Sequence, residues 1–475
     1  MGAVMIGREK EQRRLREMAD SGDAEFVAVY GRRRVGKTYL VRETFDGDFT
    51  FCHSGMARVG MVRQLQAFCS SLKEWGHANC PRLANWIDAF DELKQVVKDS
   101  RQPRKILFID EMPWMDTPKS GFIPALENFW NGWASARKDV MLVVCGSATS
   151  WIIDKVLKNK GGLHGRVTEQ IPLEPFTLRE CELYAQSRGL DYTRRMVTEC
   201  YMVLGGIPYY WRMLRRGMSP AQNFDELLFT PQGRLRGEFD ELYASLFRRK
   251  EPYVKIVSAL GAKPEGLTRD ALIALAGISD GGRTGRYLDE LESCGFIRKS
   301  HVIGHKTKES VFRLIDNYSL FYLRFIADGG DSPGRLWTER LETAEYYSWA
   351  GRAFERVCLL HVHEIKRALE IGGVKTSEFA WRGMAPDGKP AQVDLLIDRN
   401  DGIVDICEMK YTKEPYALDE GEWARISRRR GALRSVLPPA KAIHVVMVTD
   451  SPMIRNAWSK EVMGFVASDD LFASR

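Results

Sequence analysis

The sequence lacks the features that mark secreted and membrane proteins. Its nine cysteines form an odd set with no C-x-x-C pair and no metal-like clustering, which argues against a disulfide framework and predicts reduced thiols. No apolar run approaches the ~20 residues of a membrane-spanning helix. The segment MGAVMIGREKEQRR has no hydrophobic stretch of the kind found in secretory signals. We therefore expect a soluble, cytoplasmic protein without a membrane partner.

A strong excess of one charge is also missing. The chain has 70 Lys and Arg against 63 Asp and Glu, a mildly basic balance that permits a polyanionic partner without demanding one. The apolar fraction of 44% is sufficient for well-formed cores. A prior of roughly 150 residues per domain predicts about three or four domains in 475 residues.

The strongest motif lies in DAEFVAVYGRRRVGKTYLVRETF, where a glycine-bounded loop separates an apolar strand from a helix. The loop fits G-x-x-x-x-G-K-[ST], a spacing that lets backbone N–H groups wrap a phosphate at a helix N-terminus. Lys37 is expected to reach the β- and γ-phosphates of ATP, and Thr38 to ligate Mg²⁺. The predicted nucleotide contacts are Gly31, Arg32, Arg33, Arg34, Val35, Gly36, Lys37, Thr38 and Tyr39. For the three arginine side chains, a solvated loop is the alternative.

Two further apolar strands end in polar residues. The strand KILFIDEMPWM ends in Asp110, expected to hold Mg²⁺ through water, and Glu111, expected to polarise the water that attacks the γ-phosphate. An acidic pair can simply cap a strand, but the intact phosphate loop favours the catalytic interpretation. The strand DVMLVVCGSATSWI leads to Ser147, which would lie beside the γ-phosphate if the sheet is parallel.

Alternating strands and helices predict the fold of this region. An α/β fold with a doubly covered parallel sheet places its ligand at the carboxyl ends of the strands, where the loop, the acidic pair and Ser147 would meet. The predicted strands are 26–30, 49–53, 106–109, 140–145 and 169–172.

Six segments together resemble the archaeal-type ATPase family of the AAA+/STAND division of P-loop NTPases. They are MIGREKEQRRL, GRRRVGKT, FIDE, CGSATS, HGRVTEQIPLEPF and GGIPYYW, spread over about the first 240 residues. The resemblance implies a helical lid after the sheet, with Pro208 near the nucleotide, and an adenine contact near Gly7 and Arg8. Arg166 resembles an arginine finger presented to a neighbouring subunit, which requires a homo-oligomer; a plain surface arginine is the alternative.

Residues 251–316 predict three short helices followed by two strands. EPYVKIVSALGA and LTRDALIALAG each end in or near glycine, Thr268 is a candidate N-cap, and GGRTGRYLDELESCGF supplies the third helix. IRKSHVIGHKTKESVFRLID then predicts a hairpin with a basic tip. This order resembles a winged helix, which implies contact with DNA through the third helix and the hairpin, although winged helices also bind proteins. The implied DNA contacts are Arg283, Arg286, Lys306 and Lys308.

Two runs near the C-terminus, QVDLLID and IVDICEMKY, predict strands with charged groups among apolar ones. With Gly402 in the left-handed position of a three-residue loop, the register sets Asp394 opposite Glu408. It also pairs Gln392 with Lys410, Val393 with Met409, Leu395 with Cys407 and Leu396 with Ile406. Opposed carboxylates repel each other, so this pairing predicts a bound divalent cation such as Mg²⁺. A register shifted by one residue would leave an ordinary amphipathic hairpin.

The spacing of Asp394, Glu408 and Lys410 resembles the PD-(D/E)XK nuclease superfamily, although Val393 replaces the usual proline. The resemblance extends to about residue 450 and implies an α/β restriction-endonuclease-like fold. It implies Asp394 and Glu408 as metal ligands and Glu408 and Lys410 as catalytic residues. The helix WAGRAFERVCLLHV looks like the one that supplies a further acid, here Glu355, for which a solvated glutamate is the alternative.

The leading hypothesis is a multidomain α/β protein that hydrolyses ATP through Lys37 and Glu111, acts on DNA and carries a Mg²⁺-dependent nuclease-like domain. One alternative is a STAND-like signalling or scaffold switch whose nuclease-like domain binds without cutting. Another is an ATPase that only grips DNA. The predicted domains are an ATPase core at 1–175, a helical lid at 176–245, a winged helix at 250–318 and the nuclease-like domain at 337–475, after a boundary rich in Gly, Asp, Ser and Pro at 327–337.

Overall fold

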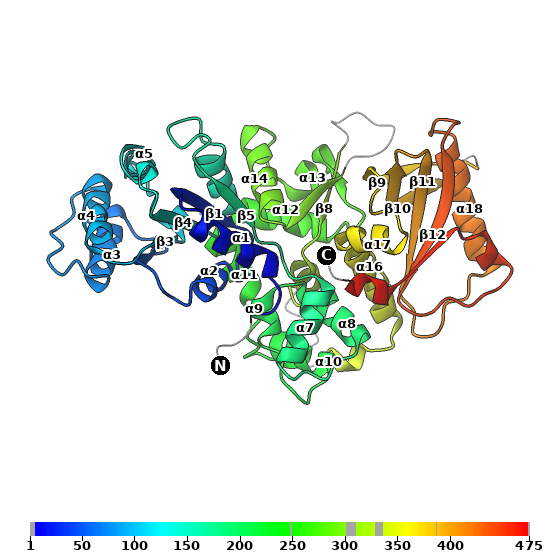
Figure 1. The fold of residues 1–475 in the computed structure, drawn as a ribbon. Helices are drawn as coiled ribbons and strands as arrows, with labels where there is room; N and C mark the ends of the chain where they lie inside the picture. The colour runs from blue at the N-terminus through cyan, green and yellow to red at the C-terminus, as the bar shows by residue number, and fades with distance from the viewer. Residues whose placement is uncertain (1–4, 248, 301–309, 328–335, 386, 474–475) are drawn as a thin grey trace. The chain divides into compact units, whose positions relative to one another are not determined.

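A computed structural model describes residues 5–247, 249–300, 310–327, 336–385 and 387–473 of the chain. The chain divides into two compact units, residues 1–175 and 176–475 (Figure 1). Among the described residues, no helix combines the length and the apolar character needed to cross a lipid bilayer.

The first unit is built on a five-stranded sheet with the order β2-β3-β4-β1-β5, in which every pair is parallel (Figure 1). Its central strands are almost wholly buried, as continuous runs of Val, Ile, Leu and Phe in a parallel sheet are expected to be. The predicted parallel sheet is therefore confirmed. The strands are β1 (Glu25–Tyr30), β2 (Phe51–Ser54), β3 (Lys105–Asp110), β4 (Val140–Gly146) and β5 (Glu169–Pro172).

Large apolar side chains join the helices of this unit to the sheet. Phe68, Trp86, Phe90 and Phe122, which lie on three helices, share one core with Phe51 of β2, and each is at most 2% exposed. Burial of this size is the main source of stability for such a unit. The helices are α1 (Glu9–Asp20), α2 (Lys37–Thr44), α3 (Met61–Glu74), α4 (Trp86–Asp99), α5 (Phe122–Gly132) and α6 (Thr149–Ile152).

The second unit begins with a group of short helices. The first of them starts with a capping box, in which Thr177 and Glu180 each accept a hydrogen bond from the other's backbone N–H. Thr193 caps the second by accepting from Met196 N at 3.3 Å. The helices are α7 (Leu178–Ser187), α8 (Arg194–Leu204), α9 (Pro208–Trp211), α10 (Pro220–Phe224) and α11 (Glu238–Leu246).

Residues 251–325 pack helices around a small antiparallel sheet with the order β6-β8-β7. Thr268 caps one helix by accepting from Ala271 N at 3.4 Å, and Gly277 ends that helix with φ +60°, as predicted. Lys306 and Lys308 lie outside the described residues, as does most of the segment 327–337. The elements are α12 (Glu251–Gly261), β6 (Leu267–Thr268), α13 (Arg269–Ala276), α14 (Gly282–Ser293), β7 (Ile297–Ser300), β8 (Val311–Leu314) and α15 (Asn317–Phe325).

A mixed sheet with the order β13-β12-β11-β10-β9 forms the C-terminal part of the second unit. The strands β9, β10 and β11 pair antiparallel, whereas β11, β12 and β13 pair parallel. Leu433 of one helix packs with Leu396 and Ile406 on one face of the sheet. The elements are α16 (Ala344–Leu360), α17 (Val362–Ala368), β9 (Thr376–Met384), β10 (Pro390–Arg399), β11 (Ile403–Lys410), α18 (Glu420–Arg434), β12 (Ala442–Thr449) and β13 (Gly464–Ala467).

Candidate functional site

A tight loop joins β1 to α2 and contains the predicted phosphate-binding motif. Gly31 has φ +144°, and a Cβ atom there would lie 2.3 Å from the carbonyl oxygen of Leu173. Gly36 has φ +95° and directly precedes the first residue of α2. Backbone geometry therefore requires both glycines, and the loop presents the N-terminus of α2 to an anion.

Lys37, the first residue of α2, turns its side chain back across the loop. Its Nζ donates hydrogen bonds to the carbonyl oxygens of Gly31 at 2.8 Å and Arg32 at 2.9 Å, and the residue is 5% exposed. Neutral carbonyl groups satisfy the donors of a buried ammonium group but leave its charge unbalanced, and a nucleotide phosphate would balance it. The lysine thus lies where the motif requires a phosphate contact.

Thr38 and Asp110 bring together oxygen atoms that suit Mg²⁺. Thr38 Oγ1 donates a hydrogen bond of 2.8 Å to Asp110 Oδ2, across 72 positions of sequence. Asp110 ends β3 and is 4% exposed. A hydroxyl and a carboxylate at this separation are hard oxygen ligands of the kind that Mg²⁺ prefers, so these two residues fit the cofactor and would hold it.

Glu111 follows directly and has a left-handed backbone conformation, with φ +46°. Its Oε1 accepts a hydrogen bond of 2.6 Å from the hydroxyl of Ser147, the first residue after β4. Next to Ser147, Gly146 lets the end of β4 approach Pro113, because a Cβ atom there would lie 2.6 Å from the proline ring. The carboxyl ends of β3 and β4 therefore bring Glu111 and Ser147 together, as the predicted parallel sheet implied, although their hydrogen bond itself was not predicted.

The other predicted contacts of the loop differ in exposure. Arg32 is 6% exposed, which excludes the solvated-loop alternative for its side chain, and Val35 is 1% exposed. Arg33 and Arg34 are half-buried, whereas Tyr39 is 48% exposed. Arg32 is thus a buried cation within the loop itself.

Three positions come from the family resemblance rather than from the loop motif. Arg8 is 7% exposed, and its Nη2 donates to the carbonyl oxygen of Glu174 at 2.6 Å. Arg166 is solvent-exposed, which suits both the arginine finger and the plain surface arginine. Pro208 is the first residue of α9 in the second unit.

In the second unit, the ladder between β10 and β11 stops just before the predicted metal ligands. The predicted pairs Leu395–Cys407 and Leu396–Ile406 are confirmed, and Gly402 has φ +90° as the loop requires. Asp394 and Glu408 lie immediately beyond the last pair, where β10 also has a bulge against β9 between residues 393 and 396. The two strands thus cease to pair at the carboxylates. We call Asp394, Glu408 and Lys410 the strand fork.

Helix α18 supplies counter-ions to two residues of the strand fork. Glu408 Oε1 accepts a hydrogen bond from Arg429 Nη1 at 2.5 Å. Lys410 Nζ donates to Glu422 Oε1 at 2.8 Å. The helix begins at this position because Asp419 caps it by accepting from Glu422 N at 2.7 Å. The charges of Glu408 and Lys410 are therefore balanced by side chains of α18.

The third residue of the strand fork has its counter-ion on β8. Asp394 Oδ1 accepts from Gln392 Nε2 at 2.8 Å and from Arg313 Nη2 at 3.2 Å. The Arg313 side chain is 10% exposed, and its Nε also donates to the carbonyl oxygen of Glu265 at 3.1 Å. Arg382 of β9 donates to the same carbonyl. The ion pair between Arg313 and Asp394 thus links the small antiparallel sheet to the strand fork.

Glu355 of α16 is affected electrostatically by the strand fork. Burial raises its pKa to about 7, and the nearby carboxylate of Asp394 adds to the rise. Burial also raises the pKa of Glu408, while Arg429 opposes that shift. Burial therefore disfavours the ionised forms of Glu355 and Glu408.

The predicted metal ligands are not assembled into a metal site. Among the residues that the structure describes, no three Asp, Glu, His or Cys side chains are grouped so that they could hold a metal ion. The expected set of Glu355, Asp394 and Glu408 is not such a group, although both strand carboxylates lie near enough to raise the pKa of Glu355. The physical reason is that Arg313 and Arg429 occupy the two strand carboxylates, so the strand fork does not fit Mg²⁺ in this arrangement.

Helix α14 presents the two arginines that the winged-helix resemblance assigned to DNA. Arg283 is exposed, and the Arg286 side chain is 75% exposed with its Nε 2.8 Å from Glu290 Oε1. Both side chains are accessible to a partner, although this exposure does not distinguish DNA from protein.

Reasoning from the sequence missed the counter-ions of the strand fork. Arg429 lies in the run ISRRRG, whose three adjacent arginines could have suggested a basic helix beside an acidic strand end. Arg313 had no comparable signal, because it is a single arginine in a strand 81 positions from Asp394.

Comparison with known proteins identifies the fold but not the activity. No protein-family model matches the chain. The uncharacterised protein MJECL04 of Methanocaldococcus jannaschii is 24% identical over 418 residues, which cover 86% of this chain and 88% of that protein.

Two solved structures are similar to this chain to different degrees. The Walker-type ATPase PABY2304 of Pyrococcus abyssi matches with a TM-score of 0.52 and 19% identity, covering 67% of this chain and 96% of that protein. The Aeropyrum pernix ORC2 protein, in ADPNP and ADP complexes, matches with a TM-score of 0.45 and 13% identity, covering 68% of this chain and 94% of that protein. The first likeness, with the parallel sheet and its glycine loop, shows that this chain has the α/β fold of a P-loop NTPase.

Proposed function

We propose that the first unit binds and hydrolyses ATP with Mg²⁺. The observation that supports this best is the 2.8 Å contact between Thr38 and Asp110, next to the buried Lys37. In P-loop proteins these residue types hold the metal ion and the phosphates. When bound, Mg²⁺ would neutralise negative charge on the β- and γ-phosphates.

The residues of the site then have separate roles. The loop amides and Lys37 bind and orient the phosphates, while Thr38 and Asp110 hold the metal ion. Glu111 accepts a proton from the attacking water, and for this its carboxylate must leave the hydrogen bond with Ser147. Arg166, which is exposed, would stabilise the transferred phosphoryl group of a neighbouring copy in a homo-oligomer.

Nucleotide binding and turnover of the parent, Lys37→Ala and Lys155→Ala would test this proposal. Lys155 is a solvent-exposed lysine of the same unit, so its replacement controls for a lost surface charge. We expect Lys37→Ala to weaken ATP binding by roughly 100-fold, because a buried charge-assisted phosphate contact is lost. Parent-like ATP binding by Lys37→Ala would contradict the proposed site.

We further propose that the second unit directs this ATPase to DNA. The element order of residues 251–314 agrees with a winged helix, and Arg283 and Arg286 are accessible on α14. The order of α16, three antiparallel strands, α18 and a parallel strand agrees with a nuclease-like fold. Binding without cleavage is favoured, because arginines of the protein already neutralise Asp394 and Glu408.

DNA cleavage is the second candidate function. It is favoured by the end of pairing between β10 and β11 at Asp394 and Glu408, the two carboxylates that the nuclease resemblance names as metal ligands. Incubation with several forms of DNA, with and without ATP and Mg²⁺ or Mn²⁺, separates the candidates. Binding with a salt-dependent affinity and intact DNA supports the first, metal-dependent products support the second, and no binding at physiological salt contradicts both.

A further inference from the structure

The end of β11 is held by a helix from the start of the second unit. Tyr411, which directly follows Lys410, is 8% exposed. Its hydroxyl donates to Glu199 Oε1 of α8 at 3.1 Å, across 212 positions of sequence. The guanidinium group of Arg195, on the same helix, lies 4.7 Å from the centroid of the tyrosine ring. Helix α8 therefore holds Tyr411, the residue next to Lys410 of the strand fork.

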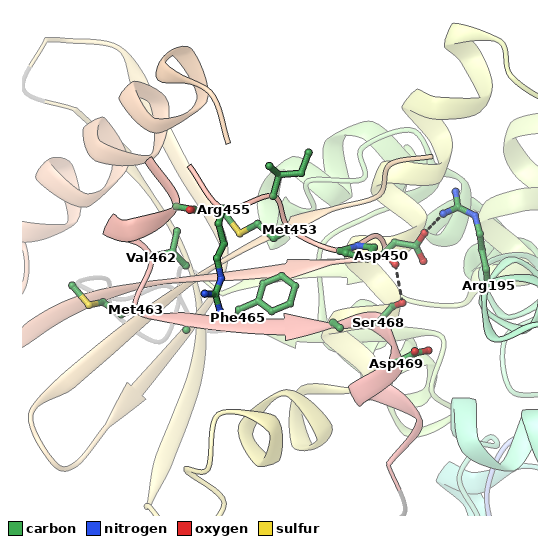
Figure 2. Close-up of a pocket in the computed structure, with 14 residues that line it drawn as sticks. Arg195, Asp450, Met453, Arg455, Val462, Met463, Phe465, Ser468 and Asp469 are labelled. Atoms are coloured by element: carbon green, nitrogen blue, oxygen red, sulfur yellow. Dashed lines mark hydrogen bonds and ion pairs between the residues drawn. The ribbon is translucent and has the colours of Figure 1, made fainter. Parts of the chain in front are cut away.

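Arg195 also joins α8 to the ends of two strands. It donates to the carbonyl oxygen of Thr412 at 3.0 Å and pairs with the carboxylate of Asp450, the residue after β12 (Figure 2). Asp450 N donates in turn to the carbonyl oxygen of Lys410 at 3.0 Å. The Asp450 side chain is 1% exposed, so its charge depends on the arginine. One guanidinium group thus ties α8 to the backbone on both sides of Tyr411.

Helix α8 is also linked to Phe354 and Arg356, the two sequence neighbours of Glu355 on α16. The ring of Phe354 lies 5.7 Å from that of Tyr411, so it packs on the residue that α8 holds. On the other side, Arg356 Nε donates to Asn317 Oδ1 at 3.3 Å, and Asn317 Nδ2 donates to a backbone carbonyl of α8 at 3.0 Å. Both sequence neighbours of Glu355 are therefore linked to α8.

We propose that Arg195 and Glu199 are positioning residues through which α8 sets the conformation of the strand fork according to the bound nucleotide. This rests on the proposed function and on the helical lid that the family resemblance implies for residues 176–245. Tyr411 and Lys410 are adjacent along the chain, so a shift of α8 that moves Tyr411 also moves Lys410. The coupling is reciprocal, because a ligand at the strand fork must change nucleotide affinity by the same factor.

Hydrogen–deuterium exchange of residues 403–412 in the full chain tests this inference. Exchange would be measured with Mg²⁺ and either ADP or a non-hydrolysable ATP analogue. In the parent, the exchange rates of these residues should differ between the two nucleotides by about 5-fold or more, the lower end of typical allosteric coupling. The double variant Arg195→Lys, Tyr411→Phe should lose this difference. Its lysine keeps a cation beside Asp450 but cannot span carboxylate, carbonyl and ring together.

Arg194→Lys is the matched control. Arg194 is the neighbouring arginine of α8, but it contacts Glu182 at 2.9 Å and Asp469 at 3.6 Å instead of the end of β11. This variant should keep the response of the parent. If it loses the response as fully as the double variant does, the path through Arg195 and Tyr411 is wrong.

Nucleotide affinity, measured on every protein, separates failure of this inference from failure of the proposed function. If the parent binds both nucleotides but its rates at residues 403–412 agree, the inference is wrong and the ATPase proposal stands. The inference is equally wrong if the double variant responds as the parent does. If the parent binds no nucleotide, the proposed function is wrong, and the inference with it.

Discussion

The phosphate loop and the strand fork both place charged side chains at the ends of apolar strands, yet their charges are balanced in different ways. At the loop, the ammonium group of Lys37 contacts neutral carbonyl oxygens, and the Thr38 hydroxyl contacts Asp110. At the strand fork, Glu408 already contacts Arg429 and Asp394 contacts Arg313. The phosphate loop therefore keeps the charge of Lys37 available for a ligand. The strand fork instead pairs its carboxylates with arginines of the protein.

This difference shows that a sequence motif alone does not determine whether a charged ligand binds. The residues that would touch the ligand are written in the motif, but the groups that compete for them come from elsewhere in the chain. A carboxylate paired with a guanidinium group gives up that pairing only if the ligand replaces its energy. Variants that remove one partner at each region therefore measure how far the two regions differ.

The largest effect is expected for Glu111→Gln. ATP turnover should fall by roughly 10²- to 10⁴-fold, because the amide cannot accept a proton from the attacking water. ATP affinity should be unchanged, since Lys37 and Thr38 are intact. Steady-state hydrolysis and equilibrium binding measure the two quantities. Parent-like turnover would show that Glu111 only caps β3 and would remove the contrast with the strand fork.

The second effect concerns the pH dependence of stability. Burial raises the pKa of Glu355 to about 7 from 4.5, so the folded state holds this proton more tightly than the unfolded chain. Stability is therefore fully present at low pH and falls as the pH rises from about 4.5 to 7. Glu355→Gln cannot ionise, and its free energy of unfolding should exceed that of the parent by up to about 3 kcal/mol at pH 8, with no such gain at pH 4.

Urea denaturation at the two pH values measures this difference. Glu420→Gln, at an exposed position of α18, is the matched control and should show no such pH-dependent gain. An equal gain at both pH values for Glu355→Gln would show that removal of the buried charge is not the cause.

A smaller loss of stability is expected for Arg429→Gln. The Glu408 side chain is 9% exposed and would lose its cation, at a cost of about 2 kcal/mol. This is less than for a fully buried pair, because the Arg429 side chain is 26% exposed. The double variant Glu408→Gln, Arg429→Gln should recover most of the loss, since it leaves no buried charge unpaired. Urea denaturation near pH 7.5 provides the values.

Arg425→Gln is the control for this pair. Arg425 lies one turn earlier on α18, and its side chain is 56% exposed beside Glu422. Its replacement should change stability by less than about 0.5 kcal/mol. If Arg429→Gln is no more damaging than this control, the internal ion pair does not stabilise the strand fork, and the contrast with the phosphate loop is lost.

The smallest effect is expected for Ser147→Ala. The hydroxyl of Ser147 holds Glu111 at 2.6 Å, and its loss should release the carboxylate for catalysis. A net hydrogen-bond contribution of 0.5–1.5 kcal/mol corresponds to a rise in basal ATP turnover of about 2- to 10-fold. A fall in turnover would show instead that Ser147 contacts the γ-phosphate, as its position after β4 predicts.

The sequence by itself determined the sheet of the first unit and the composition of its site. The strand β4 is a continuous buried apolar run, the glycines at 31 and 36 have backbone angles that side chains would strain, and Gly31 also lies too close to Leu173 for a side chain. The register next to the hairpin loop was also predictable, because the three-residue loop at Gly402 fixes which residues of β10 and β11 face each other from Leu395 and Cys407 inward. The predicted pairs of Asp394 with Glu408, Val393 with Met409 and Gln392 with Lys410 do not form, because the two strands stop pairing beyond Leu395 and Cys407. In each case the determining interaction is local or depends on a period along one element.

Only the tertiary structure decided what the charged side chains do. The contacts of Glu111 with Ser147, of Asp394 with Arg313 and of Tyr411 with Glu199 span 36, 81 and 212 positions. The spacing of a motif does not record such partners, because long-range packing brings together elements whose sequences were read separately. Charge is also balanced by whichever opposite charge lies nearest in space, so a metal-like spacing on two strands does not determine whether a metal ion or an arginine fills the position.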